Sequence, residues 1–264
     1  MPTILTHKQS QELLSLPFCY LCAQPFLQDQ KRNKDHVPPK SCFAKVDRNY
    51  PLILPAHEAC NSRYKLLDEK IGQIIGLKYG RVPSRENQRL KFAFFPPDGR
   101  RGTHGAVVNV NVHAAIRRWI QGFHAALYRE PLPLDTRFAI QTPFPAMRFT
   151  PRGPELEPVS EQHLKFVETL KINRAARNLD RIVSNNGKLT YESIWDQADG
   201  GQWISIFALD LYGWKELGDI HNFVPRGCAG SYVMSSFQAP ESATRGTRLH
   251  TLVPNYDGLD PFGR

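Results

Sequence analysis

Apolar residues recur every three to four positions in several stretches of the chain, which is the spacing of an amphipathic helix. The clearest case is LLDEKIGQII, where leucines and isoleucines fall on one face. A glycine follows closely, as is common where a helix ends. The segments predicted as helices are 8–16, 57–78, 113–129 and 160–185.

Other stretches alternate apolar and polar residues or are rich in β-branched and aromatic residues, which predicts strands. Two of them, LTYESIW and WISIFALDL, are separated by the turn-forming sequence DQADGGQ, so we expect an antiparallel hairpin. The segments predicted as strands are 90–95, 106–112, 138–141, 147–150, 189–195 and 203–211. Helices and strands are mixed, which predicts the α+β class.

Composition sets broad limits on the protein. The 264 residues are 41% hydrophobic and 11% aromatic, enough for a folded core. No apolar run approaches the length of a membrane span, and no signal peptide is apparent, so we expect a cytoplasmic protein with reduced thiols and no membrane partner. Cys42 and Cys228 are predicted to be inert thiols.

Positive charge is concentrated in the first half of the chain. Residues 1–130 carry 20 Lys and Arg against 10 Asp and Glu, a net charge of +10. Residues 131–264 carry 14 against 15, a net charge of −1. This asymmetry favours a polyanionic partner for the first half, whereas a generally basic protein would share the excess between both halves.

Two short pairs of sulfur and nitrogen donors have the spacing of a zinc site. Cys19 and Cys22 form a Cys-x-x-Cys, and His57 and Cys60 form a His-x-x-Cys after a longer loop. We expect Pro55 to lie near the start of a helix that places His57 and Cys60 on one face. The alternative is a set of scattered core cysteines and a surface histidine. The sequence favours structural zinc, which would stabilise the surrounding module.

Between the two pairs lies an Asp-His dipeptide in a basic segment, KRNKDHVPPK. Prolines after it predict extended backbone, so we expect His36 on a strand or at its end. A neutral imidazole can act as a general base, and the oxygens of Asp35 and Asn61 suit a Mg²⁺-like ion. Lys65, four residues after Asn61, is placed to hold a phosphate. The alternative is a solvated Asp-His pair in a basic loop.

The combination of CxxC, DHVPPK and LILPAHEACN resembles the HNH endonucleases, which have the ββα-metal fold. The resemblance covers about a fifth of the chain. It implies that His36 is the general base for an attacking water, and that Asp35 and Asn61 hold one Mg²⁺ or Mn²⁺ ion. The nearest counterpart of the family's middle Asn is Asn49, at an unusual distance from the second strand. The chain departs from the commoner pattern by having Asn61 in place of His, and His57 in place of the first Cys of the second pair.

The resemblance also implies a DNA substrate and a 5′-phosphate product, although no residue distinguishes DNA from RNA. Basic residues close to the motif are the candidate phosphate contacts. They are Lys31, Arg32, Lys34, Lys40, Arg63 and Lys65. The basic segment that follows the motif is either a second phosphate-contacting surface or a solvated linker. Asp68 and Glu69 are either further ligands near the site or, as the sequence favours, solvated helix charges.

The sequence thus predicts a zinc-stabilised HNH nuclease module at 1–80, a basic connector at 81–105, a mixed α+β domain at 106–234 and a polar tail at 235–264. We expect the second domain to position substrate, sense a trigger or form a homodimer. Phage defence or restriction is the biological setting that the resemblance suggests. The competing hypothesis is a non-catalytic, zinc-stabilised nucleic-acid-binding protein with a C-terminal interaction domain.

Overall fold

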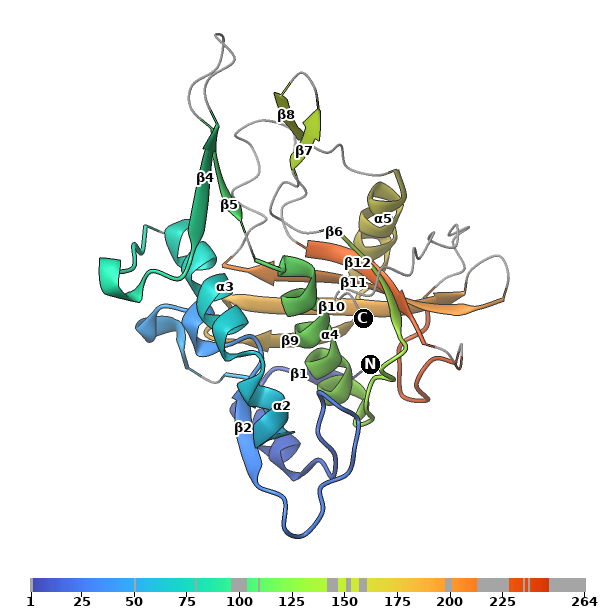
Figure 1. The fold of residues 1–264 in the computed structure, drawn as a ribbon. Coiled ribbons are helices and arrows are strands. Elements are labelled where there is room, and N and C mark those ends of the chain that lie inside the picture. Colours follow the sequence, from blue (N-terminus) through green and yellow to red (C-terminus); the bar gives the residue numbers. More distant parts are fainter. Residues whose placement is uncertain are drawn as a thin grey trace.

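A six-stranded mixed sheet is the main element of the C-terminal half of the protein (Figure 1). The computed structural model describes residues 2–49, 51–78, 80–95, 104–108, 110–141, 147–150, 153–156, 161–197, 201–212, 228–234, 236 and 238–246. The sheet order is β1 (Thr3–Ile4), β9 (Asp180–Ser184), β10 (Leu189–Gln197), β11 (Trp203–Leu211), β12 (Cys228–Val233) and β6 (Arg137–Gln141). All neighbouring strands of this sheet pair antiparallel, except that β1 pairs in parallel with β9.

The predicted hairpin is confirmed in β10 and β11, which pair from Leu189–Leu211 to Gln197–Trp203. The prediction of one helix over 160–185 is wrong for the residues after 175. Helix α5 covers only Glu161–Ala175. Arg177 then adopts a left-handed φ of 54°, and the chain continues into strand β9. Because β9 gains hydrogen bonds from both β1 and β10, distant pairing overrides the local helical pattern.

The two faces of this sheet are covered by different helices. Residues of β10 and β11 alternate between the faces, so Tyr191 and Phe207 point to one side and Ile194 and Ile206 to the other. Helix α4 (Val112–Tyr128) packs on the first side, where the Phe123 ring lies 4.6 Å from that of Tyr191. Helix α5 packs on the second side. The protein is therefore a mixed α+β structure, as predicted.

The N-terminal part of the chain is built around a two-stranded hairpin of β2 (Arg32–His36) and β3 (Ile53–His57). Helix α1 (His7–Glu12) precedes it, and α2 (Glu58–Ser62) and α3 (Lys65–Lys78) follow it. The prediction of a single helix from 57 to 78 is therefore corrected to two helices. Pro55 lies in β3 opposite Lys34, and not at a helix start, because a two-stranded hairpin leaves an edge where the missing N–H of proline is tolerated.

Smaller elements complete the described structure. Four short 3₁₀ helices are present in the described residues: η1 (Leu13–Ser15), η2 (Lys40–Cys42), η3 (Lys45–Asp47) and η4 (Arg85–Asn87). Two further hairpins are formed by β4 (Lys91–Phe95) with β5 (His104–Val108) and by β7 (Met147–Thr150) with β8 (Gly153–Leu156). Strand β12 was not predicted. In the predicted tail, Thr244 is buried and donates its backbone N–H to Asp180 at 3.0 Å. Across the described part of the chain, no helix is both long and apolar enough to cross a membrane.

Helix α4 joins the N-terminal hairpin to the sheet in one hydrophobic core. Gly122 marks the closest approach, because a Cβ atom there would lie 2.7 Å from a methyl group of Val37 and 3.1 Å from Leu54. These distances are too short for a side chain at position 122 unless Val37 and Leu54 move away. The contact thus sets the position of α4 relative to the Asp-His dipeptide on β2.

This contact can be tested with Gly122→Ala. We expect a loss of about 1–3 kcal/mol in the free energy of unfolding from overpacking, despite the better helix propensity of alanine. Chemical denaturation measures the loss. On a Val37→Ala background, which removes the opposing methyl groups, the same substitution should cost clearly less. Equal losses in the two backgrounds would show that the contact with Val37 is not the cause.

Candidate metal centre and the adjoining ion cluster

Four predicted zinc ligands meet in space. Cys19 and Cys22 lie in the turn before β2, His57 ends β3, and Cys60 lies in α2. Their ligand atoms all lie within 4.8 Å of one another. Three sulfurs and one imidazole at this distance form a donor set that can hold a zinc ion. The alternative of scattered cysteines and a surface histidine is therefore wrong.

His57 is oriented by its neighbours. Its Nδ1 lies 3.3 Å from the sulfur of Cys22, and its Nε2 lies 2.6 Å from the side-chain oxygen of Gln30. Donation from Nε2–H to Gln30 leaves Nδ1 free of a proton and aimed at the sulfurs, which is how outer partners fix a metal-binding histidine. Phe26 packs edge-on against the ring at 4.8 Å. The role of Gln30 was not predicted, because no short motif connects it with His57.

Burial, followed by the neighbouring thiols Cys19 and Cys22, raises the pKa of Cys60 to about 12, and burial also raises the pKa of Cys19. A bound zinc ion would displace the thiol protons, because the thiolate is the metal ligand. The backbone N–H of His57 already donates to the sulfur of Cys19 at 3.3 Å, which would stabilise that thiolate. The residues present thus fit zinc in number, chemistry and placement.

The Asp-His pair lies on β2, as predicted, with its two side chains on opposite faces. Asp35 is buried, with 5% of its surface exposed, while His36 is half-buried. Oδ2 of Asp35 accepts hydrogen bonds at 2.5 Å from both the Tyr20 hydroxyl and Nη2 of Arg118. The same Nη2 donates to Oδ1 of Asn61 at 3.1 Å. The structure therefore brings Asp35 and Asn61 together, with an arginine between them.

Arg118, which comes from α4, is only 1% exposed. Its Nη1 also donates to Asp68, and its guanidinium lies 4.6 Å from the centre of the Tyr64 ring. Arg118 therefore lies in the interior and adds nothing to the basic surface, and the expectation that Asp68 is a solvated charge is wrong. One feature of the sequence could have indicated that Arg118 is buried. Small residues, Ala114 and Gly122, lie four positions before and after it on the same helix face, which is typical of a closely packed face.

A Mg²⁺ ion does not fit between Asp35 and Asn61 as they stand. The guanidinium of Arg118 is bound to the oxygens that would ligate the ion, and it brings a positive charge of its own. Burial would lower the pKa of Arg118, but the neighbouring Tyr20, Asp35 and Asp68 raise it further than burial lowers it, so the guanidinium stays charged. Burial raises the pKa of Asp68 to about 6 even beside this arginine. The candidate catalytic residues Asp35 and Asn61 thus belong, together with Asp68 and Arg118, to a buried ion cluster.

His36 lies in surroundings that keep it neutral. Burial lowers its pKa to about 4, helped by the nearby positive charges of Lys40 and Arg48, and Asp35 opposes this only in part. A neutral imidazole is the form that accepts a proton. Asn49, the nearest counterpart of the family's middle Asn, is exposed.

The six candidate phosphate contacts all reach the surface. Lys31 forms an exposed ion pair with Glu58 at 3.1 Å, and Arg32 lies over the Phe26 ring at 4.6 Å. The others are the exposed residues Lys34, Lys40, Arg63 and Lys65. Their exposure fits a binding surface and fits solvated charges equally well.

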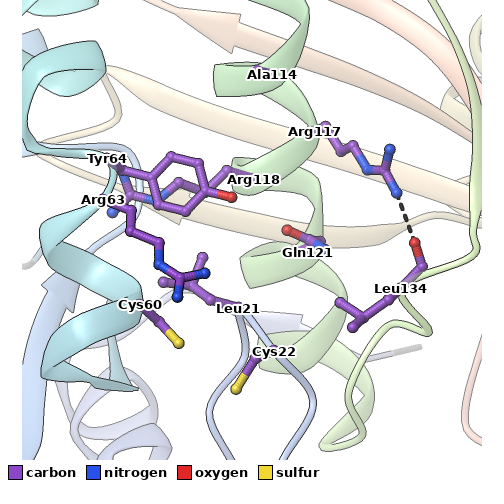
Figure 2. A pocket seen from close by; sticks show the side chains of 10 residues that line it. All are labelled: Leu21, Cys22, Cys60, Arg63, Tyr64, Ala114, Arg117, Arg118, Gln121 and Leu134. Carbon is purple, nitrogen blue, oxygen red and sulfur yellow. Dashed lines mark hydrogen bonds between the residues drawn. The ribbon is translucent and has the colours of Figure 1, made fainter. Parts of the chain in front are cut away.

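A cavity of about 410 Å³ lies between the zinc ligands and α4 (Figure 2). Cys22 and Cys60 form one end, and Arg118 and Tyr64 lie at the other. Figure 2 shows the side chain of Gln121 directed from α4 into the space. None of the described residues that line it carries a carboxylate. The cavity thus connects the metal centre with the arginine of the ion cluster.

No protein-family model matches the sequence, and the comparisons with curated proteins and with solved structures found no similar protein.

The metal centre predicts one bound zinc per chain. Cys19→Ser should lose the zinc and lower the melting temperature by roughly 10 °C, because metal binding free energy stabilises the fold. Mass spectrometry of the native protein and a thermal melt measure both effects. Cys42→Ser is the matched control, since Cys42 is a buried cysteine outside the cluster and should leave the zinc content unchanged. Full zinc content in Cys19→Ser would remove Cys19 from the ligand set.

The lowered pKa of His36 predicts a loss of stability in acid. Between pH 6.5 and pH 4 the unfolded chain binds a proton at His36 that the folded chain does not, so stability falls as the pH falls through this window. His36→Asn should abolish about 1–2 kcal/mol of that loss, allowing for screening by water. Denaturation at pH 7 and pH 4.5 measures it. His113→Asn, at an exposed position of α4, should retain the wild-type loss.

Proposed function

We propose that this protein is a zinc-stabilised nuclease of the HNH type that hydrolyses phosphodiester bonds in DNA. The observation that carries the proposal is that the residues resembling the HNH motif lie close together in the structure. Asp35 and Asn61 bind the same guanidinium, and His36 adjoins Asp35 on β2. The Cys and His cluster lies at the base of the same hairpin. The order β2, β3, α2 is compatible with a ββα-metal module.

In the proposed reaction, neutral His36 accepts a proton from a water molecule, and the water oxygen forms a bond to phosphorus. The bond from phosphorus to the 3′ oxygen breaks, this oxygen takes a proton from the surrounding water to become a hydroxyl, and the other product keeps a 5′-phosphate. Lys40 and Arg48, whose charges act on His36, would attract the phosphate. A Mg²⁺ or Mn²⁺ ion on Asp35 and Asn61 would stabilise the negative charge of the transition state, but it can bind only where Arg118 has left those oxygens.

A second candidate function is non-catalytic binding of nucleic acid, and Arg118 is the observation that favours it. A buried arginine that pairs with two carboxylates gives the cluster a structural role that needs no divalent ion. The exposed lysines and arginines around β2 would then bind phosphates without cleavage. In both hypotheses the sheet half serves to position nucleic acid, sense a trigger or bind a partner or a second copy.

Cleavage of supercoiled plasmid separates the two functions. The zinc-loaded protein is incubated with Mg²⁺, with Mn²⁺ and with EDTA, and nicked or linear product is followed on a gel. We expect metal-dependent cleavage that falls by roughly 10²–10⁴-fold in His36→Ala, the usual contribution of a general base. His113→Ala, which removes an exposed histidine of α4, should cleave at the wild-type rate.

Binding of the plasmid without cleavage, at the same affinity in His36→Ala, would support the second function instead. An oligonucleotide of RNA with the same sequence tests the choice of DNA. Cleavage by His36→Ala at the wild-type rate would remove this residue from the proposed mechanism.

A further inference from the structure

The ion cluster around Arg118 has more negative than positive charge. Asp35 and Asp68 are two carboxylates, and both pair with the one guanidinium of Arg118. Asp35 is 6% and Asp68 18% exposed at the side chain, so water screens the first charge only slightly. Buried charge without full compensation is costly. A cation of higher charge would therefore balance this cluster better than arginine does.

The cluster also has the ligands that such a cation needs. Asp35, Asp68 and Asn61 each direct a side-chain oxygen to one of the two terminal nitrogens of Arg118. Three oxygens gathered around one small volume are the type of ligand that Mg²⁺ and Mn²⁺ prefer. The sequence left Asp68 open as a further ligand but favoured a solvated charge, and the structure places it in this set. The guanidinium and a divalent ion cannot both occupy the volume.

Arg118 has a place to move to. It lines the cavity between the metal centre and α4, as Figure 2 shows, and that cavity has about 410 Å³ of space. Its guanidinium already lies over the Tyr64 ring, which also lines the cavity, so a side-chain rotation could keep this contact. Neighbouring polar groups in the cavity include Gln121.

We propose that Arg118 and a divalent cation are alternative occupants of one site formed by Asp35, Asn61 and Asp68. The site takes the cation only when the Arg118 side chain has moved into the cavity, and Asp68 is then a third ligand. This inference deepens the proposed nuclease function by stating what controls its centre, and it adds Arg118 and Asp68 to that centre. It requires no cleavage to be tested.

The experiment measures Mn²⁺ binding to zinc-loaded protein without nucleic acid, by calorimetry and by the loss of the free Mn²⁺ signal in electron paramagnetic resonance. We expect Arg118→Gln to bind one Mn²⁺ at least roughly tenfold more tightly than wild type, a typical size for such coupling. Asp68→Asn on the Arg118→Gln background should remove this gain. Arg117→Gln is the matched control, because Arg117 lines the same cavity but donates to the backbone oxygen of Leu134 at 2.8 Å.

Two results would overturn the inference. The first is equal Mn²⁺ affinity in wild type and in folded Arg118→Gln, and the second is no binding to either. If Arg118→Gln does not fold alone, it should fold when Mn²⁺ is present, and failure to do so would also count against the inference. Arg118→Lys, which keeps the charge but reaches fewer oxygens, then serves as the folded variant and should show intermediate affinity. Tight Mn²⁺ binding by a variant that cuts no DNA would leave this inference intact and contradict only the nuclease proposal.

Discussion

The contact between Arg118 and the carboxylates of Asp35 and Asp68 is the interaction on which the rest of the structure depends. It links a strand near the start of the chain with a helix more than 80 residues later. Removing charged groups from water costs several kcal/mol for each ion, and only well-placed partners offset that cost. The positions of β2, α3 and α4 are therefore constrained together, since a shift of any of them would leave a buried charge without its partner.

Helix α4 can satisfy this constraint because its faces serve different neighbours. Gly122 touches Val37 and Leu54 of the N-terminal part, and Arg118 reaches the ion cluster from the same side. Phe123 and His124 instead pack among the aromatic rings of the sheet, where Nδ1 of His124 lies 2.9 Å from the Tyr232 hydroxyl. The helix is thus a wall of the candidate site and a layer of the sheet core at the same time.

The parts of the molecule that sequence reasoning predicted well are those whose signals are local. The four zinc ligands come in two pairs of short spacing, and the β10–β11 hairpin has its turn signal between its strands. Strand β9 was mistaken for helix because its partners lie at the chain's start and in β10. Arg118 was not predicted as part of the site, because the small residues around it indicate only a closely packed helix face and do not reveal a carboxylate that lies far back in the sequence. The Cys and His group was therefore predicted from the sequence, whereas the arginine that binds Asp35 and Asn61 was not.

The parallel pairing of Thr3 with Arg181 and of Ile4 with Ile182 has a consequence for the order in which the protein is made. The four Cys and His ligands lie between Cys19 and Cys60, so they can meet once this short stretch of the chain has left the ribosome. Strand β1 instead needs β9, since Thr3 pairs with Arg181. It therefore stays without its neighbour for much longer than the Cys and His ligands stay without one another.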